Sequence, residues 1–319
     1  MEAIRSHAEN PSAFLALNEG NEHFQVPGCA GVVSYRTAGR HLLQLGGPFA
    51  PTEARRRLLE EFLAFARERG RRVLAVQLQH ADAELYAGCG FAVNQIGASY
   101  ALDLTRFTLA GAKFVRLRNK ISRALRTGLT VAETDPADCA DALASIDRAW
   151  LRAKGRHAKE LQFLVGAYGD AMQAHRRMFV ARLDSRPIGY ISYSPVFGTR
   201  SGWMHDLSRR HPDAPPGLME AINVTAVEAF RAEDVGWLHF GFTPFTGLDP
   251  AAEVNTASPL VGRIVRLLAD HGSAVYPART QLAYKEKWAP HLVLPEYLGF
   301  QGRVRPGAVW QLLRTTNAL

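Results

Sequence analysis

The chain has 319 residues, 47% of them hydrophobic and 21% charged, a balance typical of a soluble globular protein with one or two domains. Its 38 Lys and Arg exceed its 30 Asp and Glu, which gives a net charge of +8 and a pI near 9.6. That surplus favours a polyanionic partner, nucleic acid or an anionic membrane surface, over the alternative of a merely basic soluble enzyme. Three widely spaced cysteines exclude a disulfide framework and a zinc motif, so we expect a reduced, cytoplasmic chain without a metal.

The N-terminal 20 residues contain no apolar run behind a basic start, so no signal peptide is expected. The longest charge-free run, Leu85 to Leu102, is interrupted by glycines and amide side chains, which argues against a transmembrane segment. Contact with a membrane would therefore be peripheral, at the inner face.

The first third of the chain predicts a hairpin over residues 22–47, followed by an amphipathic helix that begins near Thr52. A strand over Val73–Leu78, a short helix over Asp82–Ala87 and a strand from Phe91 to about Leu104 come next. This order resembles the acyltransferase fold of the GNAT superfamily.

The segment after Asp103 is strongly basic, since no acid occurs before Glu133. Helical spacing separates an apolar face from a cationic face. Uncompensated cations repel one another, so a phosphate partner is favoured over the alternative of a solvated helix face. The cationic face comprises Lys113, Arg116, Lys120 and Arg123, and further basic residues that would extend it are Arg148, Arg152, Lys154, Arg156 and Lys159.

The second half repeats the order of the first, with strands over Met178–Leu183, Ile188–Tyr193 and Trp203–Leu207, a helix after Gly217 and a strand over Trp237–Phe242. We therefore predict an α/β (α+β) chain made of tandem GNAT-like folds with mixed central sheets. The predicted N-terminal half spans residues 1–110. The C-terminal half, 111–319, is expected to carry the active site and to begin with a basic connector helix at about 111–127.

Ligands in open α/β layers bind beyond the carboxyl ends of strands and beside helix N-termini, which here points to residues 206–217. No nucleophile elbow, Walker loop or dinucleotide glycine signature is present. An acetyl-CoA enzyme of the superfamily would carry an Arg/Gln-x-x-Gly-x-Gly/Ala turn. The two corresponding places hold Gly46-Gly47-Pro48 and Pro215-Pro216-Gly217 instead, so that cofactor is not expected.

Several motifs match a narrower pattern in their order and spacing: Tyr100-Ala101-Leu102-Asp103-Leu104, Trp150-Leu151, Asp206-Leu207 with Arg209, Pro212-Asp213-Ala214-Pro215, Gly241-Phe242 and Tyr284-Lys285-Glu286-Lys287-Trp288. Over roughly residues 20–300 they resemble the C-terminal catalytic domain of phosphatidylglycerol lysyltransferases, the multiple peptide resistance factors. The resemblance implies a tandem GNAT-like fold that transfers an amino acid from aminoacyl-tRNA to a lipid hydroxyl. Soluble relatives transfer aminoacyl groups to small metabolites.

Two segments depart from that family. Its usual Pro-Asn-Gly is Pro215-Pro216-Gly217 here, and its Trp-Glu-Pro-Arg-Tyr segment is replaced by residues 291–297, ending in Pro295-Glu296-Tyr297. Both departures concern the lipid acceptor more than the aminoacyl donor.

An aminoacyl-tRNA is already an activated ester, so transfer requires a proton acceptor, a group that stabilises the oxyanion and an anchor for the ammonium. We assign catalysis to Asp206, Lys285 and Arg209 and expect them to converge in one cleft. Asp206 would bind the ammonium or ribose hydroxyls, whereas Lys285 and Arg209 would stabilise the carbonyl or a terminal phosphate. Capping and surface ion pairing are the alternatives for these side chains.

The remaining expected contacts are with the substrate and the tRNA. The substrate contacts are Glu160, Lys154, His205, Gly217, Phe242 and Thr243, and the tRNA contacts are Lys113, Arg116, Lys120, Arg123 and Lys287. A solvated carboxylate is the alternative for Glu160, and a core histidine is the alternative for His205.

The predicted function is an aminoacyl-tRNA-dependent aminoacyltransferase that needs no cofactor, because aminoacyl-tRNA is a co-substrate. The acceptor would be a phosphatidylglycerol-type lipid or a small metabolite. An acyl-CoA-dependent GNAT N-acyltransferase and a non-catalytic RNA- or membrane-binding module are the two alternatives.

Overall fold

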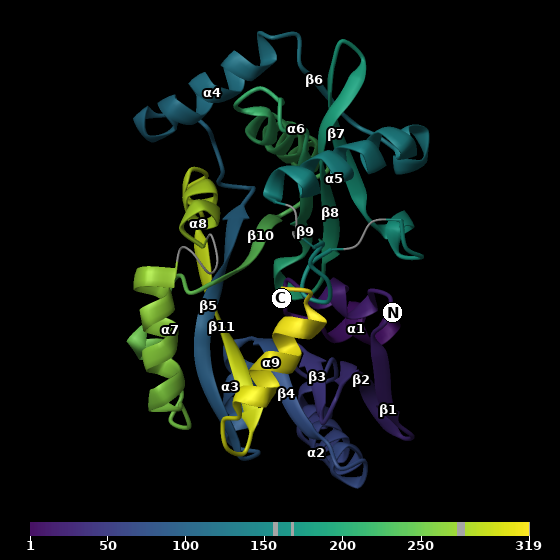
Figure 1. Cartoon of the computed structure of the whole chain (residues 1–319), viewed down its shortest axis with the longest axis vertical. Helices are drawn as coiled ribbons and strands as arrows, with labels where there is room; N and C mark the ends of the chain where they lie inside the picture. The colour runs from purple at the N-terminus through teal and green to yellow at the C-terminus, as the bar shows by residue number, and fades with distance from the viewer. Residues whose placement is uncertain (156–158, 167–168, 273–277, 319) are drawn as a thin grey trace.

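The computed structural model describes residues 1–155, 159–166, 169–272 and 278–318 (Figure 1). Arg156, one of the residues expected to extend the basic patch, lies outside them. Within the described residues, eleven strands form one continuous mixed sheet. In sheet order they are β1 (Glu22–Val26), β2 (Cys29–Ala38), β3 (His41–Leu45), β4 (Arg72–Leu78), β11 (Leu292–Gln301), β5 (Phe91–Asp103), β10 (Trp237–Pro244), β9 (Gly202–Arg210), β8 (Arg186–Val196), β7 (Arg177–Leu183) and β6 (Thr130–Glu133).

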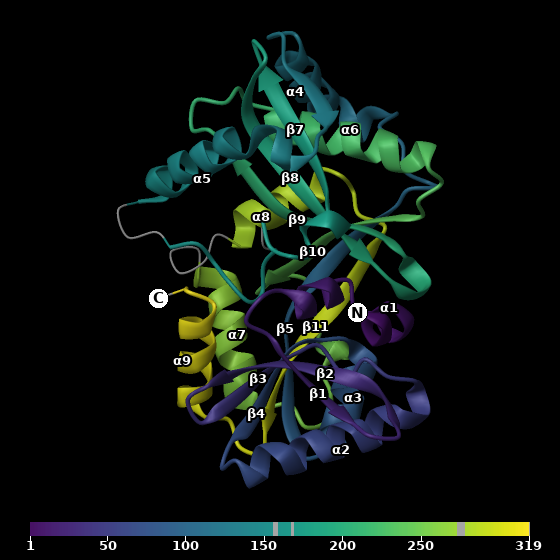
Figure 2. The same cartoon turned by 90° about the vertical axis from the view of Figure 1, so that its right-hand side faces the viewer.

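Helices cover both faces of this sheet (Figures 1 and 2). None of the helices in the described part of the chain is long and apolar enough to cross a membrane. The α-helices are α1 (Glu2–His7), α2 (Thr52–Glu68), α3 (His80–Ala87), α4 (Val115–Leu125), α5 (Ala140–Lys154), α6 (Leu218–Ala232), α7 (Pro259–His271), α8 (Ala278–Glu286) and α9 (Pro306–Thr315).

The same supersecondary unit occurs once in each half. In the first half, β3 and β4 are parallel and α2 connects them. Helix α2 packs against the sheet because its stripe of Leu58, Leu59 and Phe62 is apolar and buried. In the second half, β9 and β10 are parallel and α6 connects them. The predicted mixed α/β class and tandem organisation are therefore confirmed.

The parallel pairing of β9 with β10 is short, extending only from Gly202–Met204 on one strand to Trp237–His239 on the other. Beyond it the strands diverge, because β10 shifts register against β5 between His239 and Phe242. Gly241 sits in this bulge at φ +67°, a conformation that glycine adopts without a Cβ penalty.

Strand β11 crosses between the halves. It lies between β4 and β5, antiparallel to both, although it is about 190 residues away from β5 in the sequence. The C-terminal segment thus completes the sheet of the first half. The division at residue 110 stays a prediction about sequence units.

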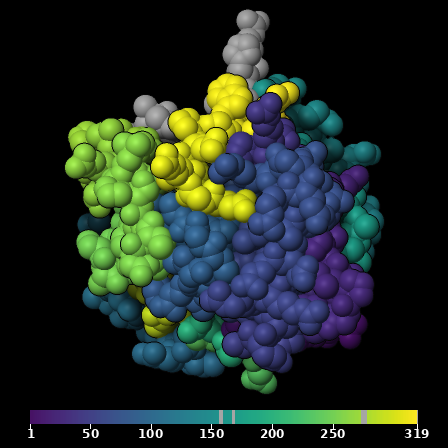
Figure 3. All heavy atoms as spheres, turned by 90° about the horizontal axis from the view of Figure 1, so that it is seen from below, coloured from purple at the N-terminus to yellow at the C-terminus, as the bar shows by residue number. Residues whose placement is uncertain are grey.

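The basic connector predicted at 111–127 is a helix. It comprises a 3₁₀ turn at Ala112–Phe114 and α4, whose Leu117, Ile121 and Ala124 are buried. Its packing partner is α6. Figure 3 shows the opposite end of the molecule, where α7 in green and α9 in yellow lie beside the blue elements of the first half.

Candidate functional site

Lys285, near the end of α8, points its ammonium group into the sheet. Its Nζ donates a hydrogen bond of 2.6 Å to the carbonyl of Gly241, in the β10 bulge, and lies 5.5 Å from the ring centroid of Tyr100. The residue is only 6% exposed, and this burial lowers the pKa of Lys285 to about 7, although the negative charge of Glu296 opposes the shift. Lys285 is therefore a buried cation that can lose its proton near neutral pH.

Glu296, in the middle of β11, is the acid next to this cation. It is completely buried and accepts a hydrogen bond from the hydroxyl of Ser99. Burial raises the pKa of Glu296 to about 7, despite the opposing effects of Ser99 and Lys285. Our sequence reasoning missed this residue, yet one acid within the mainly apolar run Leu292–Phe300 was a readable signal, because a buried strand carboxyl needs a partner.

His205, in β9, lies on the same side of the sheet as Lys285. Its ring centroid is 5.8 Å from that of Tyr193 and 5.9 Å from that of Tyr284, which neighbours Lys285 on α8. Burial, followed by the charge of Lys285, lowers the pKa of His205 to about 4. The imidazole is therefore neutral at physiological pH and can accept a proton.

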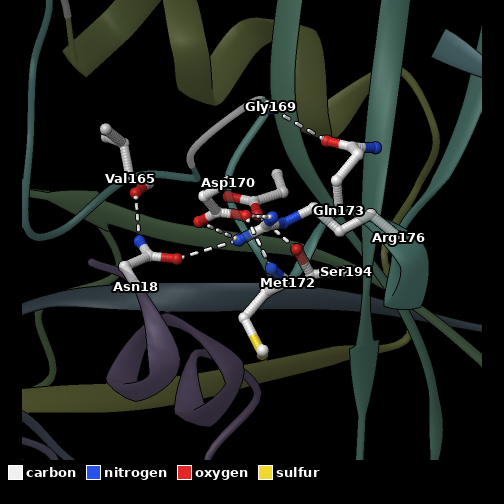
Figure 4. A network of polar contacts seen from close by, with 9 residues as sticks. Asn18, Val165, Gly169, Asp170, Met172, Gln173, Arg176 and Ser194 are labelled. Carbon is white, nitrogen blue, oxygen red and sulfur yellow. Dashed lines mark hydrogen bonds and ion pairs between the residues drawn. The ribbon is translucent and has the colours of Figure 1, made fainter. Parts of the chain in front are cut away.

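Asp206, the next residue of β9, lies on the other face and accepts a hydrogen bond from the Ser194 hydroxyl. Burial raises the pKa of Asp206, while Ser194 and the nearby guanidinium of Arg176 act in the opposite direction. Arg176 is held by Asp170 at 2.5 Å and by the side-chain amide oxygen of Asn18 at 2.9 Å, and Figure 4 shows this arrangement beside Ser194. Asp206 thus belongs to a buried polar network built by both halves.

Arg209 is held by helix α5. Its guanidinium carbon lies 4.0 Å from the ring centroid of Trp150, and its nitrogens lie 4.0 Å from Asp147 and 3.3 Å from Glu160. Asp147 also accepts a 2.6 Å hydrogen bond from Tyr190. Tyr190 lies opposite Arg209 on the adjacent strand β8. The Glu160 side chain remains 52% exposed, so it is the member of this group that a ligand can reach.

The expected convergence of Asp206, Arg209 and Lys285 is therefore not met. Successive strand residues point to opposite faces, which puts His205 on the α8 face and Asp206 on the other. A register shift opposite Ser192 and Tyr193 then brings Arg209 to the same face as Asp206. The three side chains contact separate neighbours on two faces of one sheet.

The basic connector meets α8 at one carboxylate. Lys120 of α4 and Lys287, just after α8, lie 2.8 Å and 3.1 Å from the same oxygen of Glu220. Burial alone would raise the pKa of Glu220, but the two lysines hold it below its ordinary value. Lys113, Arg116 and Arg123 are exposed, and together with Lys120 they form the α4 cationic stripe.

Both glycine positions that an acyl-CoA enzyme would use are filled by the protein itself. A Cβ at Gly217, which has φ +100°, would lie 2.5 Å from the main-chain carbonyl of Lys120. A Cβ at Gly47 would overlap the carboxylate of Asp82, which pairs with Arg55. Close packing against the protein itself therefore accounts for a glycine at each place.

Three other expected substrate contacts, Phe242, Thr243 and Lys154, make contacts within the protein. Thr243 is buried and its carbonyl accepts the Thr246 hydroxyl at 3.0 Å, and the ring of Phe242 closes over Gly97. Lys154 places its ammonium 4.9 Å from the Trp150 ring. In the described part of the chain, no three His, Cys, Asp or Glu side chains come together in a way that could hold a metal ion.

Residues 2–300 match the family described as "Phosphatidylglycerol lysyltransferase, C-terminal". The chain belongs to this family. It is 28% identical over 258 residues to a phosphatidylglycerol lysyltransferase of Bacillus subtilis, a match that covers 79% of this chain and 29% of that protein. A Staphylococcus epidermidis protein of the same name is 23% identical over 273 residues, covering 84% of this chain and 31% of the relative. The match thus spans about three tenths of the length of these two relatives.

Two solved structures share the fold. The structure of L-PGS from Bacillus licheniformis has a TM-score of 0.79 at 21% identity, covering 98% of this chain and 95% of that one. The DUF2156 domain from Agrobacterium fabrum has a TM-score of 0.79 at 23% identity, covering 99% and 94%. At these identities the likeness concerns the fold alone.

Proposed function

We propose that the chain is an aminoacyltransferase, which moves an amino acid from aminoacyl-tRNA to the hydroxyl of a phosphatidylglycerol-type lipid, or to a hydroxyl or amine of a small metabolite. The observation that carries this proposal is the family match over residues 2–300, together with curated relatives named for lysyl transfer to phosphatidylglycerol. Those relatives are about three times longer, so the activity is a proposal for this chain.

With a hydroxyl acceptor, the reaction is an acyl transfer between two oxygens. The acceptor hydroxyl oxygen forms a bond to the aminoacyl carbonyl carbon, the ester bond to the tRNA ribose breaks, and the acceptor proton ends on the ribose oxygen. His205 is neutral at pH 7 and is proposed to take that proton and pass it on. With a pKa of about 4 the imidazole is unprotonated at pH 7, so a ring nitrogen is open to the incoming proton.

Lys285 is proposed to stabilise the oxyanion that forms at the carbonyl. Its ammonium uses one hydrogen for the Gly241 carbonyl and keeps two donors. A buried cation interacts more strongly with a developing negative charge than an exposed one does, because little water screens it. His205 and Lys285 lie on one face, as a base and an electrophilic partner in one site must.

The donor is proposed to approach from the α4 cationic stripe. Exposed Lys113, Arg116 and Arg123 can each contact a phosphate of the acceptor stem. Lys120 and Lys287 share Glu220, which fixes α4 beside the end of the helix that carries Lys285. The docked tRNA end would therefore lie near the proposed reacting groups.

The groups on the opposite face are proposed to serve the substrate where β9 and β10 diverge. Arg209, with the exposed Glu160 beside it, would bind a terminal phosphate of the tRNA, which lies farther from the reacting carbonyl than the α-ammonium does. Asp206 is engaged by Ser194 in the polar network of the same face. We also propose a cytoplasmic chain that contacts the inner membrane face peripherally.

Purified protein mixed with tRNAs charged with labelled amino acids and with phosphatidylglycerol vesicles or metabolite extracts tests the function. The expected result is acceptor-dependent loss of label from one aminoacyl-tRNA, with recovery of the label on lipid or metabolite. No transfer with any amino acid would contradict it. Thermal stabilisation by acetyl-CoA but not by tRNA would instead favour the acyl-CoA alternative.

A further inference from the structure

Helix α7 has two apolar faces, one buried and one exposed. The inner face buries Val261 and Val265 against the sheet, and the N-terminus is fixed by Asn94, which exchanges hydrogen bonds of 3.1 Å and 3.0 Å with Ser258. The helix is therefore firmly attached to the first half, next to β5.

The outer face of α7 carries an exposed apolar stripe. Leu260, Ile264 and Leu267 recur at four- and three-residue spacing and are 63%, 48% and 61% exposed. Three large aliphatic side chains in one row are unusual on a monomer surface that contacts only water. We call these three residues the α7 stripe.

Cations border the α7 stripe. Arg263 and Arg266 lie between its members and are exposed, whereas Asp270, at the end of the helix, is the acid of the segment. Helix α9 lies on the same face of the sheet (Figures 1 and 2) and exposes Trp310 at 56% and Leu313 at 37%. Residues 259–319 contain eight Lys and Arg but three Asp and Glu, so they hold +5 of the net charge of +8.

We propose that α7 is a docking helix that lies in the interface of an anionic bilayer, with the α7 stripe in the acyl boundary and Arg263 and Arg266 at the lipid phosphates. An apolar face with flanking arginines is the composition of interfacial helices, and tryptophan favours the same depth. A second copy of this chain is the weaker partner, because it would place the same cations against each other. The inference rests on the proposed function only for the choice of phosphatidylglycerol as the anionic lipid.

Flotation with vesicles tests the proposal without tRNA or catalysis. The intact chain is mixed with vesicles of phosphatidylcholine alone and with vesicles that also contain about 30% phosphatidylglycerol. We expect binding to the anionic vesicles and a blue shift of tryptophan fluorescence. Leu260→Gln/Leu267→Gln should weaken binding by about tenfold or more, since two aliphatic side chains no longer insert. Glutamine is a good helix former, so the helix should persist, and a thermal melt checks this.

The arginine pair is tested separately. Arg263→Gln/Arg266→Gln should weaken binding to anionic vesicles by about tenfold, whereas Arg57→Gln/Arg67→Gln, an exposed pair on α2, should leave it unchanged. Absence of binding by the wild type, equal binding by the leucine variant, or equal binding by the α7 arginine variant would overturn the proposal. A dimer that light scattering detects in the wild type and not in the leucine variant would also overturn it. Transfer to detergent-solubilised lipid can be measured independently, so failure of docking and failure of the function are distinguishable.

Discussion

The Nζ atom of Lys285 donates to the carbonyl of Gly241 at 2.6 Å, which joins helix α8 to the bulge where β10 turns away from its parallel partner. A charged side chain is rarely taken out of water without an opposite charge or a role in chemistry. Here Glu296 favours the charged form while burial opposes it, and the resulting pKa of Lys285, about 7, lies near the working pH of a cell.

Lys285→Met keeps the volume of the side chain and removes its charge. We expect transfer from aminoacyl-tRNA to fall by about 10²- to 10³-fold, because the oxyanion loses its cationic donor. Wild-type activity should decline as pH rises above about 7, where Lys285 loses its proton. Single-turnover kinetics across pH measure both effects. A variant with unchanged rate and an unchanged alkaline limb would show that Lys285 is structural.

His205→Gln should lower transfer by about 10²- to 10⁴-fold, because the proposed proton acceptor is removed. His239→Gln is the matched control. Its ring is also buried with a pKa near 4, but it contacts the Arg200 carbonyl at 2.9 Å, so its replacement should affect the melting temperature rather than the rate. Equal losses of rate in both variants would contradict a special role for His205.

Lys285 and Glu296 should give stability a measurable pH dependence. The pKa of Lys285 is lowered from 10.5 to about 7 in the folded chain, so between these values the unfolded chain binds more protons and stability rises with pH. The pKa of Glu296 is raised from 4.5 to about 7, so stability falls as pH rises through that lower window.

The pair should therefore contribute a stability minimum near pH 7. We expect Lys285→Met to remove the rise above pH 7 and Glu296→Gln to remove the fall below it, each by about 1–3 kcal/mol in urea unfolding. Parallel pH profiles for wild type and both variants would disprove this coupling.

Asp170→Asn tests the buried network around Asp206. The ion-pair side chains of Arg176 and Asp170 are 0% and 8% exposed, so removing the acid leaves a buried cation without its partner. We expect a loss of about 3–5 kcal/mol in the free energy of unfolding. Glu133→Gln breaks an ion pair with Arg177 in which the acid is 44% exposed, and it should cost less than about 1 kcal/mol. Similar losses of unfolding free energy in the two variants would show that burial of the Arg176 ion pair adds nothing to its contribution.

Lys113→Gln/Arg116→Gln/Arg123→Gln removes the exposed members of the α4 cationic stripe. We expect weaker tRNA binding and a salt slope reduced by about 0.7–0.9 per lost phosphate contact, with an unchanged melting temperature. Filter binding over a range of salt concentrations measures the slope. Arg40→Gln/Arg57→Gln/Arg67→Gln removes the same number of charges elsewhere and should leave the salt slope unchanged. Equal slopes for the two triple variants would rule out a local docking site.

Periodicity in the sequence predicted most of the elements, because each buries one face. The stripe of α2 and the apolar face of α4 are examples of patterns that a local window contains. The basic connector was readable for the same reason, since charge and spacing are both local properties.

The arrangement of the site was not readable to the same extent. A register shift in β8 and β9 decides on which face Arg209 lies, and such a shift leaves no periodic trace. The neighbourhood of Lys285 and Glu296 depends on β11 lying beside β5, a contact between distant segments. Candidate residues could thus be named, but their grouping required the fold.

The placement of β11 also has a consequence for biosynthesis. The first half is translated early, yet the gap between β4 and β5 can close only when residues 292–301 have left the ribosome. Until then the nascent chain carries two unpaired strand edges, which are sites for aggregation and for chaperone capture. Stopping translation before Leu292 should therefore leave even the N-terminal portion of the polypeptide protease-sensitive.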